Sequence, residues 1–255
     1  QFLDGDCELE PGWLESGRAA LEADPALAVV CGRRRERFPE ASLYNRLCDM
    51  EWNTPIGPGV ACGGDSLMRS AAFRAVGGFD PTLIAGEEPE LCLRLTQADW
   101  RVSRIDAPMT RHDAAITRFD QWWRRAMRGG WARAEGFARH GRPPVNFNRK
   151  QIRSILIFGA LAPLGVLAAM LAAVLIPAAP LELAPAILLA ALALYGLMAA
   201  RIARHRRRAF GDAWPDALRY AGFVMLGKIQ EALGGARYVR ARLSGDAAHI
   251  IEYKG

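Results

Sequence analysis

The sequence lacks any pair of cysteines in a C-x-x-C spacing, and its odd number of cysteines leaves one over. A zinc ribbon needs that spacing, and small secreted scaffolds pair an even number of cysteines. We therefore expect neither a disulfide framework nor a zinc ribbon, and we expect a reducing compartment. The five cysteines are Cys7, Cys31, Cys48, Cys62 and Cys92.

The sequence also lacks the composition of a disordered chain. Hydrophobic residues make up 51% of the 255 residues and charged residues 24%, which suits one or two domains with ample core. Residues 1–200 carry 22 basic and 22 acidic groups, so the net charge of +6 lies entirely in residues 201–255, which carry 11 and 5. No basic face with interleaved aromatic residues is visible there, so we expect no nucleic-acid partner.

Charge is absent from two long apolar stretches, Ser154 to Leu181 and Leu183 to Ala200, which Glu182 separates. At about 1.5 Å per residue, each stretch can cross a hydrocarbon core of roughly 30 Å. The Pro-rich segment between them breaks the helix, so we predict two membrane helices, 154–176 and 183–200. The alternative is a buried helical hairpin in a soluble domain, whose helices normally have a polar face.

Basic residues flank the outer ends of both predicted spans. Because cytoplasmic loops carry an excess of Lys and Arg, both ends are predicted to be cytoplasmic, with only the turn near Glu182 outside. These flanking residues are Arg149, Lys150, Arg153, Arg201, Arg204, Arg206, Arg207 and Arg208.

The chain begins at Gln1, without an initiator Met or a signal peptide, and enters an apolar segment at once. We therefore expect it to be part of a longer protein, and we expect these 255 residues alone to lack activity.

Residues 1–145 alternate short apolar runs with helical patterns, which is typical of an α/β layered domain. We then expect a membrane hairpin with basic flanks over 146–208 and a cytoplasmic tail over 209–255. The predicted strands are 1–3, 26–32, 59–68 and 100–106, and the predicted helices are 11–23, 41–52, 70–76 and 87–98.

Asp4-Gly5-Asp6 places two carboxylates at the predicted end of the first strand. Ligands of layered sheets lie beyond strand ends, and carboxylates two residues apart can converge on one hard divalent cation. The spacing also occurs in ordinary surface turns, so both interpretations stay open at this point.

A second acidic cluster, Glu87, Glu88 and Glu90, begins a predicted helix. Acidic residues in a first turn are favoured by the helix dipole, so simple capping is one interpretation. The other is a general base, because a neighbouring like charge and desolvation raise a carboxyl pKa. His112 lies in a predicted loop and would act as a ligand only if that loop meets Asp6 in space.

The segment RFDQWWRRAMRGGWARAEGF predicts a helix on which Gln121, Arg124 and Arg128 share one face. Such a face can clamp a pyrophosphate, and a helix rich in Trp and Arg can lie at lipid headgroups. In the tail, an apolar face predicts an interfacial helix. That face consists of Trp214, Leu218, Met225, Ile229 and Leu233.

FLDGDCELEPGW and VGGFDPTLIAGEEPELCLRL, in this order, resemble two motifs of family 2 inverting glycosyltransferases, and QWWRR loosely resembles their Q-x-x-R-W motif. The resemblance runs from Gln1 to about Gly141 and suits the membrane-anchored bacterial branch. It implies an α/β fold: the later part of a GT-A, Rossmann-like domain, followed here by the membrane hairpin and the interfacial helix.

The resemblance implies that Asp4 and Asp6 hold a nucleotide-sugar diphosphate through Mg²⁺ or Mn²⁺, with His112 as a further metal or diphosphate contact. It makes Glu88 the catalytic base, with Glu87 as the other candidate, because Glu stands where the family has Asp. The donor or acceptor would contact residues of three segments. In the third segment, QWWRR, Arg125 stands where the family's motif has Trp. The predicted contact residues are Gly64, Asp65, Glu90, Gln121, Arg124, Arg125 and Arg128.

The predicted function is a hexosyltransferase-type enzyme, multi-pass in the inner membrane, with its catalytic domain cytoplasmic. It would move a sugar from a nucleotide sugar to a glycan or lipid-linked acceptor, with inversion, in cell-surface polysaccharide synthesis. The alternative is a non-catalytic membrane protein that keeps the fold as a binding or assembly module. An ordinary turn after a strand remains the alternative for the segment containing Gly64 and Asp65.

Overall fold

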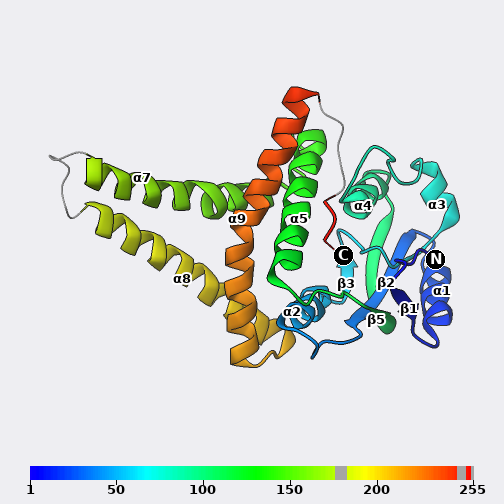
Figure 1. Ribbon diagram of the computed structural model, residues 1–255. Coiled ribbons are helices and arrows are strands. Elements are labelled where there is room, and N and C mark those ends of the chain that lie inside the picture. The colour runs from blue at the N-terminus through cyan, green and yellow to red at the C-terminus, as the bar shows by residue number, and fades with distance from the viewer. Residues whose placement is uncertain (176–182, 246–250, 254–255) are drawn as a thin grey trace. The chain divides into compact units, whose positions relative to one another are not determined.

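The computed structural model describes residues 1–175, 183–245 and 251–253. The chain divides into two compact units, Gln1–Trp122 and Trp123–Tyr253, and each is described by itself (Figure 1). The domain boundaries predicted at residues 145 and 208 stay predictions.

The first unit is a mixed α/β domain, as the alternating pattern predicts. Its central pair, β2 and β5, is parallel, whereas β1, β3 and β4 pair antiparallel with their neighbours. The strand order is β1-β5-β2-β4, and β3 also pairs with β5. In chain order the elements are β1 (Cys7–Leu9), α1 (Trp13–Ala23), β2 (Leu27–Glu36), α2 (Leu43–Trp52), β3 (Gly57–Gly59), β4 (Leu67–Met68), α3 (Ser70–Ala75), α4 (Glu87–Gln97) and β5 (Arg101–His112).

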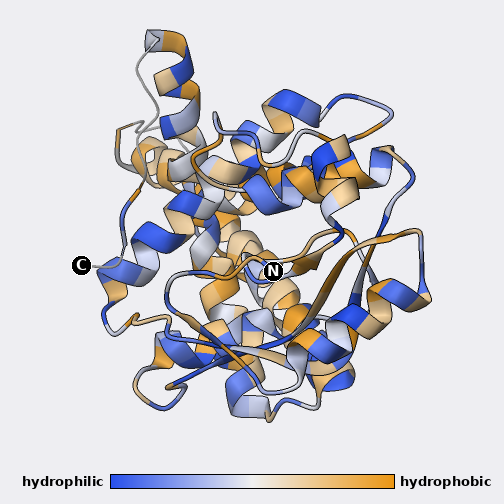
Figure 2. Cartoon of the chain, turned by 90° about the vertical axis from the view of Figure 1, so that its right-hand side faces the viewer, coloured by the Kyte–Doolittle hydropathy of each residue, from blue (hydrophilic) through white to orange (hydrophobic). Residues whose placement is uncertain are grey.

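Helices cover both faces of this sheet. Consecutive residues of β2 point to opposite faces, so neighbouring residues pack against different helices. Val30 packs in a cluster with Trp13 of α1, which is 1% exposed, whereas Val29 packs with Leu91 and Leu95 of α4. Each helix of the first unit carries both hydrophobic and hydrophilic positions, which suits this half-buried packing (Figure 2).

The four predicted helices of this unit are confirmed within two residues at each end, but the strands differ from the prediction. Residues 1–3 form only an isolated bridge between Phe2 and Ser66, and the first strand begins after the acidic pair, at Cys7. The predicted strand 59–68 is two short strands with a loop between them, and β5 continues beyond residue 106 to His112. All five cysteines are free thiols.

The second unit consists of helices. The helix α5 (Phe119–His140) begins in the first unit and continues into the second. It is followed by α6 (Arg149–Ile155), a π-helical turn η1 (Leu156–Leu161), α7 (Ala162–Leu175), α8 (Leu183–Phe210) and α9 (Trp214–Ser244).

Two helical segments, Arg149–Ala173 and Ala184–Phe210, are long and apolar enough to cross a membrane. Buried residues make up only 22% and 6% of their apolar windows, so these helices do not serve as the core of the unit. The predicted turn at Glu182 lies outside the described residues.

The helix α9 packs closely on α5 and η1 through small residues (Figure 1). A Cβ atom at Gly234 would lie 2.0 Å from the Met127 carbonyl oxygen, and one at Gly159 would lie 2.0 Å from that of Lys228. The apolar face predicted for α9 is only partly buried in this packing. Met225 is buried, whereas Trp214 and Leu218 are exposed.

Candidate active site

The Asp4-Gly5-Asp6 segment forms a tight turn that leads into β1. The Cys7 backbone N–H donates to the Asp4 carbonyl oxygen at 3.1 Å, which closes the turn. The two carboxylates therefore precede a strand, where we had predicted that they follow one. The cause is long-range pairing, since residues 1–3 form only a single bridge, whereas Cys7–Leu9 pair with the distant strand β5.

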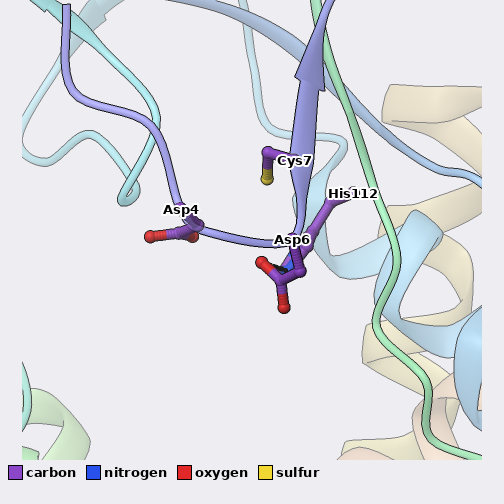
Figure 3. A group of neighbouring side chains, drawn as sticks. All are labelled: Asp4, Asp6, Cys7 and His112. Carbon is purple, nitrogen blue, oxygen red and sulfur yellow. Dashed lines mark ion pairs between the residues drawn. The ribbon is translucent and has the colours of Figure 1, made fainter.

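His112 is the last residue of β5 and pairs in register with Cys7 of β1, which brings its side chain to Asp6 (Figure 3). Its Nε2 lies 2.8 Å from the Asp6 Oδ1. The imidazole stacks on Trp52 at the end of α2, with 4.7 Å between ring centroids. His112 thus lies in a strand, not in the predicted loop, and it satisfies the condition of meeting Asp6.

Four groups that could ligate a metal converge here: one atom each of Asp4, Asp6, Cys7 and His112, all within 4.8 Å of one another (Figure 3). Burial raises the pKa of the Cys7 thiol, whose Sγ lies 3.2 Å from Asp65, so this thiol is not poised as a thiolate ligand. The remaining two carboxylates and one imidazole fit a divalent cation such as Mg²⁺ or Mn²⁺.

Asp65 lies directly behind the acidic turn and is fully buried. Its Oδ1 accepts from the Asp4 backbone N–H, and its Oδ2 accepts from the Thr110 hydroxyl. The contact of Asp65 with a donor or acceptor stays a prediction, and in this structure its buried carboxylate bonds to the acidic turn and to Thr110.

Arg34 of β2 is not among the predicted site residues, yet its guanidinium reaches the acidic turn. Its Nε lies 2.9 Å from the Asp65 Oδ2, and its Nη2 lies 3.5 Å from the Asp4 Oδ2. The guanidinium also lies 5.5 Å from the ring centroid of Trp52, another residue that was not predicted from the sequence. Strand alternation is the signal that could have found Arg34, because it places this residue on the opposite face from Arg33 and Arg35.

Gly63 and Gly64 make room for these charged groups. A Cβ atom at Gly64 would lie 2.1 Å from the Asp4 Oδ1, and one at Gly63 would lie 3.0 Å from the Arg34 Nη2. The close approach predicted for Gly64 is real, but in this structure its partner is the Asp4 carboxylate.

Glu87 and Glu88 begin α4, which follows Gly86 in the left-handed conformation at φ 85°. Burial raises the pKa of Glu88 to about 7, and the neighbouring Glu87 carboxylate adds to the rise. The Asp4 carboxylate also raises this pKa, and the Arg34 guanidinium lowers it. The two acidic motifs therefore share one electrostatic environment, and a carboxyl group with a pKa near 7 suits a general base.

Glu90, one turn into α4, is 3% exposed and forms an ion pair with Arg94 at 2.7 Å. Arg94 in turn donates to the carbonyl oxygens of Val76 and Gly78. The Glu90–Arg94 pair therefore fixes the start of α4 against the preceding loop, and the contact of Glu90 with a donor or acceptor stays a prediction.

Gln121 is 5% exposed, and its Oε1 accepts from the backbone N–H groups of Thr117 and Arg118 at the start of α5. Gln121 therefore caps this helix, and its contact with a substrate stays a prediction. Arg124, Arg125 and Arg128 belong to the second unit, and their roles stay predictions.

Comparison with known proteins finds similarity to a glycosyltransferase. Over 140 residues the chain is 31% identical to the pre-mycofactocin glycosyltransferase of Mycobacterium tuberculosis, both in strain CDC 1551 / Oshkosh and in strain ATCC 25618 / H37Rv. The match covers 51% of this chain, but the chain spans only about 30% of the length of these curated relatives. No protein-family model matches the sequence.

Proposed function

We propose that this chain is part of a membrane-anchored glycosyltransferase with a GT-A-type catalytic domain, which uses a nucleotide-sugar donor. The observation that carries the proposal is the convergence of Asp4, Asp6 and His112, whose potential metal-ligand atoms lie within 4.8 Å of one another. The raised pKa of Glu88, to which the Asp4 carboxylate contributes, supports it. The similarity to a glycosyltransferase over half of the chain supports sugar transfer in general.

In this proposal Asp4, Asp6 and His112 hold a Mg²⁺ or Mn²⁺ ion together with the donor diphosphate. When bound, that cation supplies positive charge to stabilise the leaving diphosphate. The paired strands β1 and β5 fix His112 beside Asp6, so the donor-binding side chains are in place before substrate arrives.

Glu88 takes the proton from the acceptor hydroxyl as the hydroxyl oxygen attacks the anomeric carbon of the donor sugar. Attack from the face opposite the leaving diphosphate inverts the configuration at that carbon. A carboxylate whose pKa is near ambient pH can accept this proton and still be ionised in a large fraction of molecules.

The helices α7 and α8 would anchor the catalytic domain at the cytoplasmic face of the inner membrane. Their exposed leucines favour contact with lipid over contact with water, and the basic flanks set the orientation. The acceptor would be a glycan or a lipid-linked sugar, which suits a role in cell-surface polysaccharide synthesis.

The test is an assay of the full-length protein against a panel of nucleotide sugars, with Mn²⁺ and then with a chelator. We expect transfer from one donor, loss of turnover on chelation and recovery when Mn²⁺ is added back. Binding of a nucleotide sugar without turnover of any donor would instead indicate a non-catalytic binding module.

A further inference from the structure

Asp65 is surrounded by polar partners from three separate segments: the acidic turn, β2 and β5. The backbone N–H of Asp4 bonds to its Oδ1 at 3.0 Å. Its Oδ2 accepts from the Thr110 Oγ1 at 2.7 Å and from the Cys7 Sγ at 3.2 Å, and it forms an ion pair with the Arg34 Nε at 2.9 Å. One buried carboxylate therefore ties both ends of the turn that carries Asp4 and Asp6 to the central strands β2 and β5.

The two carboxylates of this turn owe their positions to different contacts. Asp6 is placed by the pairing of β1 with β5, which sets Cys7 opposite His112. Asp4 lies before that strand, so the ladder does not hold it. Its backbone is held by Asp65, and its carboxylate lies 3.5 Å from Arg34 and against the bare backbone of Gly64.

We propose that Asp65, paired with Arg34, is a positioning residue that holds the Asp4-Gly5-Asp6 turn in the conformation that binds the divalent cation. This inference rests on the proposed function. Outer groups that orient metal ligands contribute strongly to metal affinity, because a ligand already in place loses less conformational freedom on binding.

The chain offers a matched control on the other face of β2. Asp49 is 5% exposed, and its Oδ1 lies 3.3 Å from the Arg33 Nη2 and 3.0 Å from the Arg35 Nε. It also accepts from the backbone N–H of Glu36. Asp49 thus resembles Asp65 in burial and in its arginine partners, but these contacts tie α2 to β2 and do not involve the acidic turn.

The test compares Asp65→Asn with Asp49→Asn in the detergent-solubilised chain, titrated with Mn²⁺ alone. Electron paramagnetic resonance measures the free Mn²⁺, and circular dichroism measures folding. Asn at position 65 keeps the size of the side chain, but its amide NH₂ group replaces one carboxylate oxygen. This group cannot accept the hydrogen bonds that the oxygen accepts. We expect Mn²⁺ affinity to fall by about 10-fold to 100-fold in Asp65→Asn and to stay at the parent value in Asp49→Asn.

Thr110→Val and Thr110→Ser provide a milder pair in case Asp65→Asn does not fold. Val removes a hydroxyl donor to Asp65 at nearly constant volume, so Mn²⁺ binding should weaken, whereas Ser keeps the hydroxyl and should restore it. The same pair separates a lost hydrogen bond from a disturbed core.

The outcomes separate this inference from the proposed function. Parent-like Mn²⁺ affinity in Asp65→Asn, together with loss of binding in Asp6→Asn, overturns the positioning role and keeps the metal site. Equal weakening in Asp65→Asn and Asp49→Asn also overturns it, because the cause is then a general loss of stability. A parent chain that binds no Mn²⁺ at millimolar concentration overturns both.

Discussion

Glu88 combines two properties at the residue scale that a simple helix cap does not need. Burial of its carboxyl group raises its pKa to about 7. The carboxylate of Asp4, a residue far away in the sequence, adds to this rise. Capping by the helix dipole favours a charged carboxylate, whereas this environment favours the protonated one. A raised pKa of this kind is what the proposed role of Glu88 as the base requires.

Replacing Glu88 by Gln should remove proton acceptance while size and most hydrogen bonding are kept. In the full-length enzyme we expect kcat to fall by about 10²-fold or more, with donor binding largely unchanged. Steady-state kinetics and donor titration measure the two effects. Glu87→Gln is the matched control, and if it abolishes turnover while Glu88→Gln does not, the base is Glu87.

The pH dependence follows from the same group. Because the pKa of Glu88 is raised to about 7, the base is mostly protonated below that pH, and kcat/KM should rise with pH and level off above it. Stability should show the opposite sign. The folded pKa exceeds the ordinary value of 4.5, so this contribution to stability is lost as pH rises through about 7.

Thermal unfolding at pH 8 separates the two roles of Glu88. The neutral amide in Glu88→Gln avoids the cost of burying a charge, so the variant should unfold at or above the parent temperature. A lower unfolding temperature would indicate that the carboxylate stabilises the helix start.

At the scale of elements, helices were predictable and short strands were not. The spacing of apolar residues around Trp13 or Leu91 is set within one helix, so the local sequence is enough to place α1 and α4. The strands β1, β3 and β4 have three residues or fewer, and each exists because a distant strand pairs with it. No local pattern carries that information.

The candidate site divides in the same way. The carboxylates of the acidic turn and of α4 stand out within short segments, but spacing alone left a surface turn and a helix cap as alternatives, and only the family resemblance implied their site roles. Arg34, Trp52 and the buried role of Asp65 depend on pairing between segments far apart in sequence. A sequence without a structure offers no means to see those contacts.

The packing of α9 on α5 gives a prediction at this scale. Gly234→Ala should destabilise the second unit by about 1–3 kcal/mol, because its Cβ atom would lie 2.0 Å from the Met127 carbonyl oxygen. Gly222→Ala on the same helix meets no atom within 4 Å, so it should stabilise α9 by up to about 1 kcal/mol. Thermal unfolding in detergent measures both, and equal shifts would contradict the close packing.

At the scale of the whole molecule, the apolar helices and their basic flanks predict the topology. A reporter fused to the C-terminus should be active on the cytoplasmic side, as should one inserted in the loop before α6. A reporter inserted near Glu182 should score as periplasmic. A periplasmic signal from the C-terminal fusion would contradict the hairpin.

The position of β5 in the sheet also has a consequence for how the chain folds during synthesis. This strand pairs with β1, β2 and β3, yet it is the last strand of its unit to leave the ribosome. Until Arg101–His112 has emerged, β1 and β3 lack the strand they pair with, and the apolar side chains of β2 stay partly uncovered. Such late, long-range pairing is slow and exposes the nascent chain to aggregation. Because Arg149–Ala173 follows soon after, completion of the sheet and membrane insertion of the first apolar helix would overlap in time. A delay in either step would therefore affect the other step.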